Sequence, residues 1–437
     1  MANSIGFAFF ILVNAALFIR PAEIIPEWED VPVYQIFIMA ALAFSLPCVL
    51  TQLSMKSLAA RPITVCVLGL LVALELSHLV HGRTWHMRMV GFEFAKIVAY
   101  YLLLVGLLDT PARLGRFMAW TVFFAFVMVS LAVLNYHQIV SIASLGEGNQ
   151  DVSEQLAPGV WTATRLVTTG IFSDPNDLCL ILLVSAAVCC YELGSHRSRV
   201  LRFCWLVPIS AFCYAIALTY SRGGLIAMLV GLLVLFRGWF GWRKAILLSV
   251  VAVPLVLLLY GGRQTEISGD TGTAQERFHY WSEDMVIFRQ EPLFGIGTTI
   301  LEDQTKRVAH NTYLQCYVEM GFVGGTLMVG AFYSAIGGLV RATGGKPRIH
   351  EPELRRLLPY LTAAVAGYAT GIMFLSRDQV LPTYMMLGLA AVYLRLVSPH
   401  PALVRYRMSP RFVGRMIAVS VIFCVFMYVW VRVSIRY

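Results

Sequence analysis

The stretch SDPNDLCLILLVSAAVCCYELGSHRSRVLRFCW, residues 173–205, decides the fold. It opens with a helix-start signal, because Asp174 suits a cap, Pro175 suits the first helical position, and Asp177 adds an acid in the first turn. An apolar run of roughly membrane-crossing length follows. The run ends in a short loop that carries three arginines. This order predicts a transmembrane helix that leaves the membrane through a basic loop.

The same pattern recurs along all 437 residues, of which 58% are hydrophobic and only 14% charged. Soluble globular proteins carry about 25% charged residues. A membrane β-barrel would need alternating residues instead of solid apolar runs. We therefore expect an all-α, polytopic transmembrane bundle that forms a single membrane domain over residues 1–437. About 12–13 spans are expected, with the apolar runs near 4–19, 33–54, 63–80, 91–108, 117–135, 176–193, 203–219, 223–240, 245–261, 311–340, 358–376, 380–396 and 416–434.

The net charge of +9 does not indicate a nucleic-acid partner, because the basic residues lie in short loops between apolar runs. There they act as topology signals. The nine cysteines lie within or beside apolar runs, with neither metal-ligand spacing nor a disulfide framework. The N-terminal stretch has no basic segment and no A-x-A cleavage site, so it is expected to be a retained first helix.

Loop charges predict the orientation. With the N-terminus in the cytoplasm, the six inside loops carry 20 Lys and Arg residues, against 11 in the outside loops. This matches the positive-inside pattern of polytopic membrane proteins. Two outside loops are long, residues 136–175 and 262–309. Long loops are usually functional, so we expect these two loops to carry part of an active site on the outer face.

The first outer motif is TYSRGG, residues 219–224, where Arg222 enters an apolar span. A cation is unfavourable at the positive end of a helix, so helix stability does not explain it. Arg222 beside free helix N–H groups, with glycines that allow close approach, would bind an anion. The alternative is an arginine that only snorkels to the membrane interface.

The second motif is TRLVTTGIFSDPNDLCL, residues 164–180. Helix capping accounts for Asp174 and Asp177. It gives no reason for Arg165, nor for Asn176, which prefers caps and turns to helix interiors. Both are candidate substrate-binding residues.

The third motif is AQERFHYWSEDMVIFRQEPLFGIG, residues 274–297. Apolar residues at helical spacing predict a helix that lies on the outer surface, with one apolar face formed by Phe278, Trp281, Met285 and Phe288. Arg277 and Arg289 flank this face and are candidate substrate ligands. The alternative is a plain interfacial helix. The following Gly-x-Gly predicts a turn.

The fourth motif is VAHNTYLQCYVEMGFVGG, residues 308–325. His310 stands at the outer boundary of an apolar span, with Asn311 and Tyr313 as candidate substrate-binding neighbours. Glu319 lies on the opposite helical face, about 13 Å deeper, and is expected to serve helix packing. The alternative for His310 is a capping or interfacial residue.

Several arginines near one histidine suit a phosphorylated substrate. Arginine binds phosphate oxygens through a planar fork, and histidine can take a proton from an attacking hydroxyl. Arg165, Arg222, Arg277 and His310 lie on four outer segments, and no Asp-rich metal motif or nucleophile triad accompanies them. The set predicts group transfer from a lipid diphosphate without a metal or other cofactor.

In the order of these four motifs, residues 164–325 resemble the O-antigen ligase and O-antigen polymerase superfamily of bacterial inner-membrane glycosyltransferases. The resemblance implies a helical fold of the C-type glycosyltransferase kind and a glycan donor linked to undecaprenyl diphosphate. It also implies that His310 is the base that activates the acceptor hydroxyl and that Arg222 clamps the diphosphate. Arg165 and Arg277 match further diphosphate-binding arginines less closely.

The resemblance leaves the acceptor open. It is lipid A core for a ligase, or another lipid-linked repeat unit for a polymerase, in O-antigen or exopolysaccharide assembly. The lipid bilayer and polysaccharide-assembly proteins are the other expected partners. The alternative class is a transporter or flippase of lipid-linked glycan, which predicts charges at the membrane midplane and a repeat between the halves of the chain. The spans carry few charges, and no clear repeat is visible.

Overall fold

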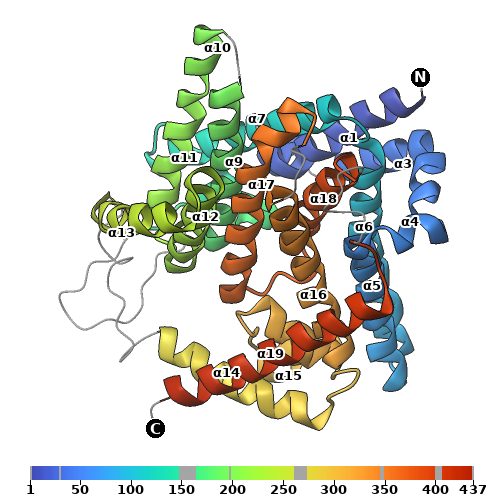
Figure 1. Cartoon of the computed structure of the whole chain (residues 1–437). Coiled ribbons are helices and arrows are strands. Elements are labelled where there is room, and N and C mark those ends of the chain that lie inside the picture. Colours follow the sequence, from blue (N-terminus) through green and yellow to red (C-terminus); the bar gives the residue numbers. More distant parts are fainter. Residues whose placement is uncertain are drawn as a thin grey trace. The chain divides into compact units, whose positions relative to one another are not determined.

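The computed structural model describes residues 2–28, 31–146, 164–195, 198–259, 273–344, 349–398 and 406–435, most of which are helical (Figure 1). In this part of the chain, eleven helices are long and apolar enough to cross a membrane. The expected all-α, polytopic membrane fold is therefore confirmed.

Two of the expected spans are not among these eleven helices. The run near 380–396 forms α18 (Leu381–Leu396), which is apolar but shorter than the spanning helices. The run near 245–261 forms α13 (Trp242–Leu259), which is not among the eleven. Large parts of the two long outer loops, residues 147–163 and 260–272, lie outside the described residues.

The chain forms two compact units, and each is assembled from three separate stretches. The first unit comprises Met1–Leu46, Leu107–Glu266 and His350–Tyr368. The second comprises Pro47–Gly106, Ile267–Ile349 and Ala369–Tyr437. The single membrane domain expected from the sequence stays a prediction.

In the first unit, α9 (Pro175–Ser195) packs against α7 (Pro111–Tyr136), α11 (Leu206–Thr219) and α12 (Arg222–Phe240) (Figure 1). Helix α1 (Ala2–Ile19) packs on α7, and α13 packs on α12. The unit also holds most of two long helices, α3 (Val33–Gln52) and α17 (Pro352–Gly371). Its short helices are α2 (Pro21–Ile24), η1 (Pro26–Trp28), α8 (Ala143–Gly146), η2 (Gly170–Phe172) and α10 (Arg199–Cys204).

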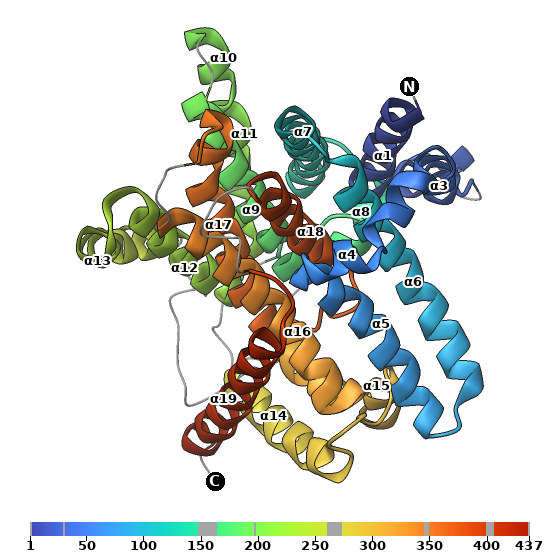
Figure 2. The same ribbon diagram turned by 45° about the vertical axis from the view of Figure 1, so that its right-hand side comes forward.

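In the second unit, α16 (Thr312–Gly344) is central. It packs against α5 (Pro62–Val80), α14 (Thr273–Gln290), α18 and α19 (Pro410–Ser434). Helices α14 and α19 lie side by side, as Figures 1 and 2 both show. The unit also contains α4 (Met55–Ala59), most of α6 (Thr84–Leu107), α15 (Ile300–Thr305) and η3 (Ile372–Phe374).

Helix α16 is broken at Gly321, whereas the sequence predicts one continuous span over 311–340. Gly321 has φ 65° and ψ −164°, outside the helical region. The break leaves backbone carbonyls without helical partners. The carbonyls of Val318 and Glu319 instead accept hydrogen bonds from the N–H groups of Ile296 and Gly297, at 3.0 and 2.9 Å. The expected Gly-x-Gly turn at residues 295–297 is thus confirmed, and it packs against the broken part of α16.

Helix α14 confirms the predicted amphipathic helix. Trp281 is 2% exposed and lies in an apolar cluster with Leu314 of α16 and Met427 of α19. The apolar spacing predicts that Asp284 lies off the apolar face, but this prediction is wrong, because Asp284 is fully buried. Arg307 donates to Asp284 at 2.9 Å and to Glu283 at 2.7 Å. Proximity in sequence predicts instead that Arg307 pairs with Glu302 and Asp303, and this prediction is wrong.

Candidate functional site

In the first unit, the chain turns sharply between α11 and α12. Tyr220 ends α11 in the left-handed conformation, with φ 46°. Ser221 then caps α12, and its hydroxyl accepts a hydrogen bond from the N–H of Gly224 at 3.0 Å. Arg222 is the first residue of α12. The sequence-predicted position of Arg222 at a helix N-terminus is confirmed.

Gly224 allows this turn to pack closely on α9. A Cβ atom at residue 224 would lie 2.2 Å from Sγ of Cys179, which is closer than any side chain tolerates. The first turn of α12 therefore lies directly against the first turns of α9, and Asn176 lies within reach of Ser221.

Asn176 connects three segments of this unit. Its Oδ1 accepts hydrogen bonds from Ser221 Oγ at 2.7 Å and from Arg165 Nη2 at 3.0 Å. Arg165 Nε also donates to the carbonyl of Thr219 at 2.8 Å. Asp174 accepts from both the backbone N–H and the side-chain amide of Asn176, at 2.7 and 2.9 Å. The Asp174 cap is confirmed, and it also orients Asn176.

The first unit therefore brings Arg165 and Asn176 together with the N-terminus of α12. Arg165 and Arg222 are half-buried and have interactions beyond these hydrogen bonds. Two guanidinium groups beside the positive end of a 19-residue helix form an environment that favours an anion.

In the second unit, His310 lies just before α16 and has φ 50°. The left-handed region is uncommon for residues other than glycine and requires surrounding contacts to hold it. The backbone N–H of His310 donates to Ser376 Oγ at 2.9 Å. The carbonyl of the preceding Ala309 accepts from the indole of Trp281 at 2.8 Å. The half-buried imidazole therefore projects from a fixed backbone.

Asn311 and Tyr313 have structural contacts. Asn311 is fully buried and caps α16, because its Oδ1 accepts from the N–H groups of Tyr313 and Leu314, each at 3.1 Å. Tyr313 is also buried and donates to the carbonyl of Ala369 at 2.9 Å. Their expected role in substrate binding stays a prediction.

A further arginine, Arg377, lies beside the segment that carries His310, and none of the four sequence motifs includes it. Its backbone N–H donates to Thr312 Oγ1 at 2.9 Å, and Thr312 donates to the carbonyl of Leu375 at 2.7 Å. Residues 375–377 therefore lie along the segment that carries His310. One signal could have revealed Arg377, since it is an arginine in a short outside loop, which the positive-inside rule disfavours.

The two arginines of α14 occupy different surroundings. Arg277 is half-buried near the start of the helix. Arg289 is exposed and lies over the ring of Tyr428, 5.1 Å from its centroid. Arg289 is the single charged residue that lines an otherwise mostly apolar cavity of about 230 Å³ between α14, α16 and α19.

The described residues contain no group of three or more His, Cys, Asp or Glu that could hold a metal ion. Glu319, deep in α16, is buried and accepts from Gln315 Nε2 at 3.2 Å. Gln315 belongs to the same helix, so the expected role of Glu319 in helix packing stays a prediction.

Comparison with known protein families shows which family this chain resembles. Residues 207–329 match the model of the O-antigen ligase family. The match supports the resemblance of this chain to the O-antigen ligase and polymerase superfamily. The matched segment includes Arg222, Arg277, Arg289 and His310, whereas Arg165 and Asn176 precede it. No similar protein was found among proteins with curated functions.

The match and the eleven candidate spans of the described residues together support a multi-pass membrane protein with an O-antigen ligase domain. The matched segment contains three of the four sequence motifs, at residues 219–224, 274–297 and 308–325. The roles of individual residues are not part of the match and are treated below as proposals.

Proposed function

We propose that this enzyme transfers a glycan from undecaprenyl diphosphate to an acceptor hydroxyl at the periplasmic face of the bacterial inner membrane. The family match supports this reaction class. The surplus of Lys and Arg in the opposite loops supports the orientation. The observation that carries the donor assignment is the arginine-flanked N-terminus of α12, because a diphosphate is the part of such a donor that two arginines would bind.

Arg222 and Arg165 act on the donor in this proposal. The diphosphate leaving group gains negative charge as the glycosidic bond breaks. Guanidinium groups and helix N–H groups that are already positioned stabilise that charge without reorganisation. Asn176 keeps Arg165 in place through the hydrogen bond at 3.0 Å, so Asn176 is a positioning residue here.

His310 acts on the acceptor. Its imidazole takes the proton of the acceptor hydroxyl while the acceptor oxygen forms a bond to the anomeric carbon of the donor. The bond from that carbon to the diphosphate oxygen breaks, and undecaprenyl diphosphate leaves with the electron pair. The proton then passes from His310 to water, which restores the base.

The apolar cavity beside Arg289 gives the lipid part of a substrate a place in the second unit. Met285, Phe288 and Tyr317 contribute apolar walls, and Arg289 supplies one positive charge. A long hydrocarbon chain with an anionic head group has this combination of chemistry. We assign this cavity to a lipid-linked substrate.

Binding and turnover measured separately test these roles. Purified protein in nanodiscs is titrated with a lipid-diphosphate glycan, and single-turnover transfer is then measured. We expect Arg222→Ala to weaken donor binding about 10-fold or more and His310→Asn to leave binding unchanged while transfer stops. The reverse pattern, with binding lost in His310→Asn and intact in Arg222→Ala, would contradict both assignments.

A further inference from the structure

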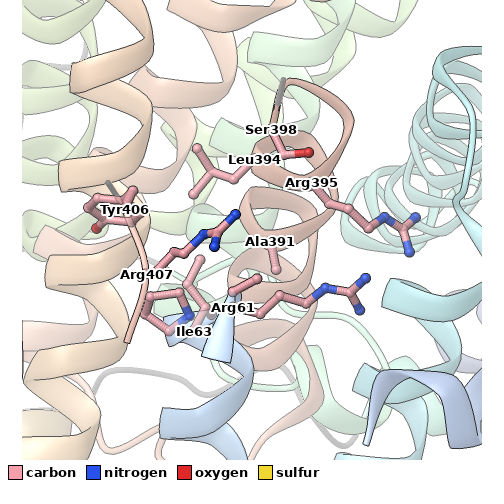
Figure 3. A pocket seen from close by; sticks show the side chains of 10 residues that line it. Arg61, Ile63, Ala391, Leu394, Arg395, Ser398, Tyr406 and Arg407 are labelled. Carbon is pink, nitrogen blue, oxygen red and sulfur yellow. The ribbon is translucent and has the colours of Figure 1, made fainter. Parts of the chain in front are cut away.

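A second cavity lies in the second unit, where three segments distant in sequence meet. It has a volume of about 230 Å³ and is lined by the start of α5, the end of α18 and residues 406–407 (Figure 3). Met408 N–H donates to the carbonyl of Ala59 at 2.9 Å and holds residues 406–408 beside the start of α5.

This cavity belongs to the opposite end of α16 from His310. Tyr406, one of its lining residues, donates to the carbonyl of Ser334. Ser334 is 22 residues beyond the first residue of α16, which corresponds to roughly 30 Å along the helix. Since His310 precedes that first residue, the cavity is separate from the proposed catalytic residues. The loop charges assign this end of the unit to the cytoplasm.

Three arginines line the cavity, and its ten lining residues include no carboxylate. Arg61 and Arg395 extend toward the same side, and the guanidinium group of Arg407 lies between Tyr406 and Leu394 (Figure 3). Arg341 lies over the Tyr406 ring, 4.9 Å from its centroid, and adds a fourth positive charge nearby. Like charges so close together repel one another unless an anion lies among them.

Arg61 shows that this charge is not fully balanced within the protein. Its Nη1 is buried and has no hydrogen-bond partner in the described structure. Burial lowers the pKa of Arg61, because the charged form is poorly solvated there. A purely topological arginine would instead extend its guanidinium group to water.

The walls determine what kind of anion fits. Ile63, Ala391 and Leu394 line the cavity with apolar side chains, so a small hydrated ion would leave apolar surface uncovered. Arginine binds phosphate oxygens with paired hydrogen bonds, and the N-terminus of the 19-residue α5 adds free N–H groups at the same place. We propose that this cavity binds the phosphate group of an anionic phospholipid, with the first part of an acyl chain against the apolar walls.

The test compares lipids on delipidated protein in detergent. Phosphatidylglycerol, zwitterionic phosphatidylcholine and inorganic phosphate are each titrated, and retained lipid is counted by native mass spectrometry. We expect one phosphatidylglycerol to bind at least about 10-fold more tightly than phosphatidylcholine. Inorganic phosphate should compete only weakly. Tight binding of inorganic phosphate without binding of phosphatidylglycerol would overturn the lipid assignment.

Variants locate the binding site. Arg407→Gln removes an exposed cavity arginine, so folding should be preserved, and Arg61→Gln removes a half-buried one. Both should weaken phosphatidylglycerol binding about 10-fold. Arg411→Gln, an exposed arginine four residues further on and outside the cavity, is the matched control and should change it less than 2-fold. Equal losses in Arg407→Gln and Arg411→Gln would show diffuse surface attraction and overturn the site. The measurement does not depend on transfer activity, so it is independent of the proposed function.

Discussion

His310 holds a left-handed backbone conformation that contacts from two other segments maintain. Ser376 binds its N–H, and Trp281 binds the carbonyl of the residue before it. Such a conformation costs on the order of 1–3 kcal/mol. Histidine and asparagine tolerate it better than alanine does. Asparagine is therefore a better replacement than alanine in a test of the role of His310.

Replacing His310 should abolish transfer without unfolding the protein. We expect His310→Asn to lower the transfer rate by roughly 10²–10⁴-fold, the usual contribution of a general base. Asparagine keeps the backbone tolerance, so thermal stability should stay close to wild type. His279→Asn, an exposed histidine on α14, is the control and should retain full activity. Transfer by His310→Asn within a few-fold of wild type would rule out His310 as the base.

Arg222→Lys should impair transfer nearly as much as Arg222→Ala, because lysine keeps the charge and loses the planar fork. Transfer rates and donor affinity of both variants provide the measurement. Arg237→Lys, in the last turn of the same helix, is the matched control and should behave like wild type. Full activity of Arg222→Lys would mean that a point charge is sufficient.

At the scale of single residues, rules that use only neighbours in sequence predicted part of the candidate site. Asp174 as a cap and Arg222 at the start of α12 followed from residues adjacent in sequence. The hydrogen bonds of Ser376 and Arg377 to residues 310–312 join positions about 65 residues apart, and no local pattern encodes such a pairing. The same reason applies to Arg307, whose carboxylate partners lie 23 and 24 residues away on α14 and not in its own loop.

At the scale of elements, the break in α16 is the main feature that the sequence analysis did not predict. Glycine within an apolar run is compatible with a continuous helix, so the run over 311–340 predicted one span. The break depends on residues 292–297, since Phe322 N–H donates to the carbonyl of Pro292 at 2.8 Å across it. Only the folded structure shows this dependence.

Gly321→Ala should therefore destabilise the second unit. A Cβ atom at residue 321 would lie 2.3 Å from the backbone carbonyl carbon of Leu293, and the φ of 65° disfavours alanine. We expect a loss of more than about 1 kcal/mol in the free energy of unfolding, measured by thermal unfolding in detergent. Gly414→Ala, in helix α19 with no neighbouring atom within 4 Å, should gain up to about 1 kcal/mol instead. Equal stability of the two variants would contradict the proposed packing.

Asp284 should make the stability of α14 depend on pH. Burial raises the pKa of Asp284 from 3.8 to about 6, although Arg307 lowers it. The folded protein thus holds this proton more tightly than the unfolded chain. The stabilising contribution is complete below a pH of about 4 and is lost as the pH rises through about 6.

We therefore expect Asp284→Asn to reduce the pH dependence of the unfolding free energy by roughly 2–3 kcal/mol over this range. Thermal unfolding between pH 4 and pH 7 provides the measurement, with Glu283→Gln, an exposed neighbour, as control. Identical pH profiles of wild type and Asp284→Asn would show that Asp284 titrates at its usual pKa.

At the scale of the whole molecule, composition was sufficient to predict the class. An apolar content of 58% and repeated runs of spanning length led directly to a polytopic helical protein. The grouping of helices into two units could not be predicted in this way, because each unit combines three separate stretches of chain. This grouping depends on side-chain packing between helices that are distant in sequence. Hydrophobic periodicity within one helix does not predict such packing.

Transfer should survive removal of divalent metals. The arginines already provide positive charge for the leaving diphosphate, and Asp174 is engaged as a helix cap. Turnover in nanodiscs with and without EDTA, followed by added magnesium or manganese, measures this. Activity lost with EDTA, restored by metal and absent in Asp174→Ala would replace the arginine clamp by a metal site near residues 174–177.

The most direct measurement of the central claim is product analysis with purified protein, a glycan linked to undecaprenyl diphosphate, and each acceptor supplied separately. We predict a new glycosidic product with one acceptor: glycan on lipid A core for a ligase, or a longer lipid-linked chain for a polymerase. The product should be absent with His310→Asn. An unchanged donor with both acceptors, together with movement of that donor across the bilayer of proteoliposomes, would contradict the account and indicate a transporter.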